Sequence, residues 1–238
     1  MQNKTLEEIR QVIGKLREQK GKEKETLKLI NEALSFGHDF VANLFFEEAL
    51  THQHLYMNDS TNKEALADMK KAILKASFYV RKYELIVWNS RLYRFMGRVA
   101  DYRGQYKKAI SLYKKSIKFV NLGPEQFRIY ELKSFLSFSL IMSGKYLEGD
   151  KLAGQVYKIF VSSEGKLLKD KDYKTWYIWL SGHVMRILNA YLDKKVNYDK
   201  TQAKEQIEFL EKEFSLKKFE FGYRKQEFEE LKNRLKLN

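Results

Sequence analysis

Three arginines fall on one side of a helical stretch, at spacings of three and four residues. Such spacings place side chains on the same face of an α-helix. A guanidinium group offers paired N–H donors that match the two oxygens of a carboxylate or a phosphate. Arg91, Arg94 and Arg98 are therefore predicted to bind an anion, and Tyr102 adds an apolar contact on the same arc. The structural alternative is that these arginines pair with acidic residues of the next hairpin, for example Glu131.

A second candidate group is aromatic and basic, in the segment TWYIWLSGHVMRIL. Trp179, His183 and Arg186 recur there at spacings of four and three. If this side of the helix faces a groove, it anchors a buried side chain of a bound peptide. If it faces a neighbouring helix, it is core packing with one hydrogen-bonded histidine. The candidate peptide-binding residues are Arg91, Arg94, Arg98, Tyr102, Trp179, His183 and Arg186.

Metal-binding and catalytic chemistry find little support in the sequence. Glu48 and His52 are four residues apart, but His54 points to another side of the helix and no further ligand is apparent for a zinc site. The chain has no cysteine, which excludes thiolate chemistry and disulfides. No glycine-rich phosphate loop follows a strand, and no serine stands at a strand-to-helix turn. We predict a protein without metal, cofactor or enzymatic activity.

Turn signals divide the whole chain into helices. One proline in 238 residues and 44% hydrophobic residues suit an all-α protein, and no segment alternates like a β-strand. Capping boxes at Thr5–Glu8 and Thr61–Glu64 begin two of the helices, whereas SSEGKLLKDKD is predicted to be a loop or short irregular turn. The predicted helices cover residues 4–20, 23–36, 39–57, 62–82, 86–103, 106–120, 125–143, 146–162, 173–193, 200–214 and 220–236.

Small residues indicate how some of these helices pack. Gly104 and Gly144 stand 40 residues apart, each in a tight turn before a tyrosine, where a positive φ is expected. Gly97 and Ala109 lie on the packing sides of the two helices that Gly104 joins, and their minimal side chains let these helices approach closely. A period of this length is typical of helical-hairpin repeats, in which each hairpin must stack on the next.

The segment around Gly104 resembles a tetratricopeptide repeat, which pairs two antiparallel helices. An aromatic and a large apolar residue precede glycine in the first helix, and small and aromatic residues follow the turn in the second. A degenerate second copy comes 40 residues later. The resemblance is carried by Tyr93, Met96, Gly97, Gly104, Tyr106, Ala109, Tyr113 and Ser116, and then by Leu136, Leu140, Gly144, Tyr146 and Ala153.

This resemblance implies a right-handed α-solenoid, with another solenoid or an irregular helical bundle as the alternative. The first helix of each hairpin would line a concave groove that binds an extended peptide, often through basic side chains. We expect a single domain with an N-terminal hairpin in residues 1–37 and repeat-like hairpins in 38–170, clearest at 90–121 and 130–160. The C-terminal helices in 171–238 would end in a capping helix.

The charge of the chain favours an acidic partner. The formal net charge is +14 and the pI is near 9.6, and residues 91–118 alone carry +8. Five lysines share the outer side of the helix after Gly104, where they are either solvated or contact a phosphate backbone. We therefore predict a non-catalytic scaffold for an acidic peptide or protein segment, with a nucleic-acid-binding repeat protein as the alternative. The outward lysines are Lys107, Lys108, Lys114, Lys115 and Lys118.

Cellular context is predicted from what the chain lacks. Uncharged apolar stretches reach only 11 residues, whereas a membrane-spanning helix needs about 20. The lack of cysteine fits a reducing compartment. We predict a soluble, cytoplasmic protein with no membrane partner, monomeric or weakly dimeric.

Overall fold

Apolar residues at helical spacing recur along the chain, and helices form where they do. A computed structural model describes residues 6–34, 41–122, 128–217 and 222–236, which contain twelve α-helices, two short 3-10 helices and no strand. The all-α prediction is confirmed over these residues. The elements are α1 (Leu6–Arg17), α2 (Glu23–Leu34), α3 (Val41–Asn58), α4 (Lys63–Lys82), η1 (Ile86–Trp88), α5 (Asn89–Tyr102), α6 (Tyr106–Phe119), η2 (Val120–Leu122), α7 (Arg128–Met142), α8 (Tyr146–Val161), α9 (Ser163–Lys171), α10 (Tyr173–Lys194), α11 (Lys200–Lys217) and α12 (Gly222–Leu235).

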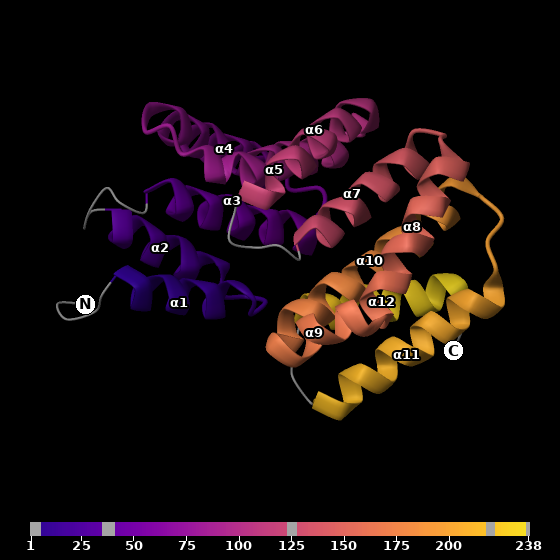
Figure 1. The fold of residues 1–238 in the computed structure, drawn as a ribbon. Coiled ribbons are helices and arrows are strands. Elements are labelled where there is room, and N and C mark those ends of the chain that lie inside the picture. The colour runs from indigo at the N-terminus through magenta and orange to yellow at the C-terminus, as the bar shows by residue number, and fades with distance from the viewer. Residues whose placement is uncertain (1–5, 35–40, 123–127, 218–221, 237–238) are drawn as a thin grey trace.

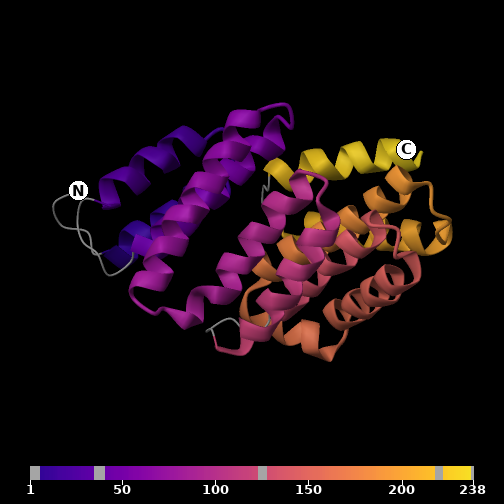
Figure 2. The same cartoon turned by 90° about the horizontal axis from the view of Figure 1, so that it is seen from above.

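Consecutive helices pack as pairs, α3 with α4, α5 with α6, and α7 with α8. Figures 1 and 2 show these pairs following one another along the molecule, with α1 and α2 at one end and α10, α11 and α12 at the other. The turns inside two of the pairs are those predicted, because Gly104 has φ 68° and Gly144 has φ 90°. These left-handed conformations favour glycine, since a Cβ would clash with the backbone.

The apolar core runs along the chain and has no single centre. One cluster joins α3, α4 and α5 through Phe46, Met69 and Phe95, and the next joins α5, α6 and α7 through Tyr113 and Leu132. The largest cluster joins helices α7 to α12. Each pair of helices therefore depends on its neighbours to bury its apolar side. Among the helices of the described residues, none combines the length and apolar composition that a membrane crossing requires.

The predicted irregular segment SSEGKLLKDKD is wrong, because α9 forms there. The side chain of Ser162 accepts a hydrogen bond from the backbone N–H of Glu164 at 3.2 Å, which caps the helix. Leu168 anchors it in the core at 5% exposure. So short a helix carries too few apolar residues to show a periodic pattern.

The capping box predicted at Thr61 and Glu64 is also wrong. Asn62 caps α4 instead, because its side-chain oxygen accepts a hydrogen bond from the backbone N–H of Ala65 at 2.9 Å. The hydroxyl of Thr61 donates to Asp59 in the preceding turn. The other predicted box begins at Thr5, which lies outside the described residues.

Candidate functional site

A cavity of about 1120 Å³ lies between the helices. Its described lining residues come from α1, α3, α5, α7, α10 and α12, with a smaller contribution from the end of α9 and from Glu18 and Asp172. Within the part of the chain that the structure describes, no lining residue belongs to α2, α4, α6 or α8. The first helix of each of the four N-terminal pairs therefore faces the cavity, and the second helix faces away from it.

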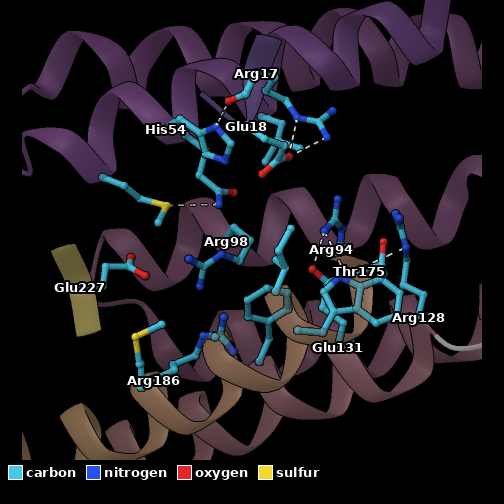
Figure 3. A pocket seen from close by; sticks show the side chains of 18 of the residues that line it. Arg17, Glu18, His54, Arg94, Arg98, Arg128, Glu131, Thr175, Arg186 and Glu227 are labelled. Carbon is cyan, nitrogen blue, oxygen red and sulfur yellow. Dashed lines mark hydrogen bonds and ion pairs between the residues drawn. The ribbon is translucent and has the colours of Figure 1, made fainter. Parts of the chain in front are cut away.

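Four cavity-lining arginines surround the carboxylate of Glu131, as Figure 3 shows in part. We call Arg94, Arg98, Arg128 and Arg186 the arginine cluster. Nη1 of Arg94 donates to both carboxylate oxygens of Glu131, at 3.0 and 3.1 Å, and Nε of Arg128 lies 4.0 Å from one of them. Burial would raise the pKa of Glu131, but all four guanidinium groups act against it and the pKa is lowered. Glu131 therefore remains ionised among an excess of positive charge.

Aromatic rings support the guanidinium groups at the centre of this cluster. The guanidinium carbons of Arg98 and Arg186 lie 4.5 and 4.2 Å from the centre of the Phe135 ring. Arg98 also lies 4.5 Å from the Tyr102 ring and donates a hydrogen bond to the Tyr102 hydroxyl at 2.5 Å. A guanidinium group that stacks on a ring is held in place while its edge can still donate hydrogen bonds. Two cations held close to one ring repel each other, and a nearby anion reduces this repulsion.

Asp101 is a second acidic residue at the cluster, but other donors occupy its oxygens. It is buried at 6% exposure and accepts hydrogen bonds from the hydroxyls of Tyr113 at 2.5 Å and Ser139 at 2.6 Å. Its nearest approach to Arg98 is 3.6 Å. Burial raises the pKa of Asp101, although Arg98 opposes this effect. Against the two carboxylates of α5 and α7, the four guanidinium groups keep a positive excess.

Arg91 lies beside the cluster and ties helices together. Its guanidinium group donates to Asn43 at 2.6 Å and to Glu47 at 2.7 Å, both on α3. Glu47 also accepts a hydrogen bond from Arg17 of α1. Burial opposes ionisation of Glu47, but Arg17 and Arg91 lower its pKa to about 2. Arg94 thus pairs with Glu131 of the next pair of helices, as the structural alternative predicted, whereas Arg91 pairs with Glu47 of the preceding pair.

Six of the seven predicted contact residues line the same cavity, and His183 does not. His183 is 2% exposed, and its ring nitrogens lie 2.9 Å from the Ser134 hydroxyl and 3.1 Å from the Ala153 carbonyl oxygen. It is rotated about 60° from Arg186 around α10. His183 is therefore a hydrogen-bonded core residue, which is the packing alternative given in the sequence analysis. The residues that line the cavity are Arg91, Arg94, Arg98, Tyr102, Trp179 and Arg186.

Burial of His183 predicts an acid-sensitive fold. Burial and the nearby Arg186 lower the pKa of His183 to about 3. The unfolded chain takes up a proton on this histidine below a pH near its ordinary pKa of 6.5, whereas the folded chain does not. The stability is therefore complete above that pH and falls as the pH decreases towards the folded pKa. The loss at pH 5.5, relative to pH 7.5, is expected to be about 1 kcal/mol.

Urea denaturation at the two pH values measures this loss, and His183→Gln is the matched variant. Glutamine keeps a donor and an acceptor but does not titrate in this range. Its stability is expected to change less between pH 7.5 and 5.5 than that of the unchanged protein. Equal changes in both proteins would contradict the assignment.

Trp179 differs from the buried tryptophan on the same helix. The indole N–H of Trp176 donates to the Phe160 carbonyl at 2.9 Å, and Trp176 is 2% exposed. Trp179 is half-buried and lines the cavity, and its indole N–H has no hydrogen-bond partner among the described residues. It offers a ring face and a donor beside the arginine cluster.

The residues weighed as metal ligands in the sequence analysis do not form a group of three in the described structure. Glu48 forms an ion pair with Lys75 at 3.2 Å, and burial lowers the pKa of His52. Nδ1 of His54 lies 2.9 Å from the Arg17 carbonyl oxygen. Among the described residues, no three histidine, aspartate or glutamate side chains are grouped as metal ligands would be.

Two parts of the site escaped the sequence analysis. Arg128 was overlooked, although it precedes Glu131 by three residues on the same helix, a spacing that places both side chains on one face. The charged face of α12 was not considered as part of a site. Its charged residues at 227, 230 and 234 follow helical spacing, but nothing in the sequence indicates that they reach α5. Comparison with known protein families, curated proteins and solved structures gives no match for this chain.

Proposed function

We propose that this protein is a non-catalytic scaffold of the tetratricopeptide-repeat-like α-solenoid type. It binds an acidic peptide or protein segment in the cavity. The alternation of cavity-facing and outward-facing helices supports the solenoid interpretation, as do the glycine turns 40 residues apart. This is the arrangement that the resemblance implied for a peptide groove.

The arginine cluster is the observation that carries the proposal. Its excess positive charge sits on the wall of a cavity, and aromatic rings hold two of its guanidinium groups. Charged donors fixed in advance lose little freedom when an anion arrives. Carboxylate groups of a ligand match the paired donors of arginine, and Trp179 provides an adjacent apolar contact.

The size of the cavity also favours a peptide over a small molecule. Pockets for small ligands occupy about 300–1,000 Å³ and are mostly apolar. This cavity measures about 1120 Å³, and arginine and carboxylate side chains from several helices line it. An extended segment of several residues contacts such a long, polar surface more completely than a compact ligand does.

The proposal is tested with the double variant Arg98→Gln, Arg186→Gln. Its affinity for a fluorescent acidic peptide, measured by anisotropy, is expected to fall about tenfold or more, since two charged donors are lost. Arg91 and Arg94 are unsuitable for this test because their ion pairs with Glu47 and Glu131 join helices. Thermal melting of both proteins verifies that the variant is folded.

The matched control removes charge from the outer surface. Lys107→Gln, Lys108→Gln and Lys114→Gln change exposed residues of α6, which contribute nothing to the cavity lining. This variant is expected to bind the acidic peptide almost as tightly as the unchanged protein. If instead the lysine variant loses affinity for duplex DNA or RNA, and that affinity falls steeply with salt, the nucleic-acid alternative is favoured.

A further inference from the structure

The C-terminal helix α12 places acidic residues in the same cavity, opposite in charge to the arginine cluster. Glu227, Glu230 and Arg234 of α12 line it, at spacings of three and four residues that place them on one face. Figure 3 shows Glu227 pointing from α12 towards Arg98 of the arginine cluster. The charge of Glu227 also acts on Tyr102, the residue that accepts a hydrogen bond from Arg98. The two sides of the cavity therefore differ in sign.

Several contacts hold α12 in this position, so its acidic face is part of the cavity wall. Leu231 is fully buried, at 0% exposure, in the core that includes α10 and α11. Arg234 forms an ion pair with Asp193 of α10 at 2.6 Å. At the other end of the cavity, Lys20 hydrogen-bonds to Gln226 and links α12 to the segment after α1. The helix thus spans from the C-terminal core to the N-terminal pair.

Glu230 of α12 differs in its partners from the acidic residues of α3 and α7 that line the cavity. On α3 and α7, Glu47 and Glu131 are already bound by arginines. On α12, the Glu230 carboxylate accepts a hydrogen bond from the amide of Gln226 at 2.8 Å, and no cation of the described residues lies within ion-pair distance of it. Glu230 is exposed at the cavity edge. A cationic group of a ligand can therefore approach Glu230 without displacing an internal cation.

We infer that the bound segment carries both charges, with an acidic residue at the arginine cluster and a basic residue at Glu227 and Glu230. This inference rests on the proposed function. A wholly acidic segment that extends from the cluster towards α12 meets two carboxylates and is repelled. Because the two walls carry opposite charges, they attract a segment with an acidic residue at the cluster and a basic residue at α12. They repel a segment that is acidic along its whole length. The α12 glutamates are thus specificity determinants of the groove.

The test compares three labelled peptides of equal length by anisotropy at one ionic strength. The first has an acidic half and a basic half, the second an acidic half and a glutamine half, and the third is acidic throughout. The unchanged protein is expected to bind the mixed-charge peptide about 5-fold more tightly than the acidic–glutamine peptide. It is expected to bind the wholly acidic peptide least tightly of the three.

The variant Glu227→Gln, Glu230→Gln is expected to lose the preference for the mixed-charge peptide and to bind the wholly acidic one more tightly. The matched control is Glu229→Gln, because Glu229 is exposed and does not line the cavity. It should keep the preference of the unchanged protein. The peptide comparison on the unchanged protein still decides the question if the double variant does not fold.

The outcomes separate the two proposals. If the unchanged protein binds none of the peptides, the proposed function fails. If it binds all three with equal affinity, or prefers the wholly acidic peptide, the proposed function stands and the inference about α12 is overturned. If Glu229→Gln loses the preference as fully as the double variant does, the preference arises from overall charge, and the inference is again overturned.

Discussion

Replacing Gly97 by alanine is expected to lower the free energy of unfolding by about 2 kcal/mol or more. A Cβ at this position would lie 2.5 Å from Cε1 of Tyr113 and less than 3.0 Å from two further ring atoms. The ring cannot move away easily, because Tyr113 is fully buried at 0% exposure and stacks on Phe135. Its hydroxyl donates to Asp101 at 2.5 Å, so a shift of the ring also disturbs the support of the arginine cluster.

The matched control is the same substitution at Gly154, in the exposed middle of α8. A Cβ there meets nothing within 4 Å. Alanine is the better helix former, so Gly154→Ala is expected to raise the free energy of unfolding by about 0.5–1 kcal/mol. Urea denaturation monitored by circular dichroism measures both changes. Equal effects of the two substitutions would contradict the tight contact between α5 and α6.

Most helices, and the turns at Gly104 and Gly144, were predictable because their signals are local. Gly104 and Gly144 mark turns through a backbone conformation that depends on one residue, and both have the expected positive φ. Gly97 was predicted to permit a close approach of two helices. The structure confirms the closeness and adds its cause, since the vacant space is filled by the Tyr113 ring.

The site was only partly predictable, because its chemistry depends on contacts between distant segments. Helical spacing placed Arg91, Arg94 and Arg98 on one face, and the sequence analysis named Glu131 as a possible partner of that face. Spacing does not reveal that Phe135 lies under both Arg98 and Arg186, or that α12 approaches Tyr102. It also left His183 between two interpretations, which only burial in the core distinguishes.

Replacing Glu131 by glutamine is expected to lower the free energy of unfolding by about 3 kcal/mol, because buried guanidinium groups lose their shared counter-charge. The side chain of Glu131 is 12% exposed, and that of Arg94 is 8% exposed. The matched control is Glu148→Gln, since Glu148 forms an exposed ion pair with Lys145 at 3.5 Å. This change is expected to cost no more than about 0.5 kcal/mol.

The difference in the free energy of unfolding between the unchanged protein and Glu131→Gln should depend on pH, which provides a second measurement. The arginine cluster lowers the pKa of Glu131, so its contribution to stability is complete above its ordinary pKa of 4.5 and is lost as the pH falls towards the lowered value. The unchanged protein and Glu131→Gln should therefore differ most at neutral pH and become more alike below pH 4.5. A constant difference across this range would show that the charge of Glu131 is not what stabilises the fold.

The same variant connects stability with binding. With Glu131 neutral, the arginine cluster has a larger positive excess, and a ligand carboxylate can take the place of the lost one. An acidic peptide should therefore raise the melting temperature of Glu131→Gln more than that of the unchanged protein, because at one concentration a ligand that binds more tightly stabilises the folded state more. The glutamine-substituted version of the peptide should raise neither. If the acidic peptide stabilises both proteins equally, its carboxylates do not bind at the cluster, and the positive charge around Glu131 serves only to join α5, α7 and α10.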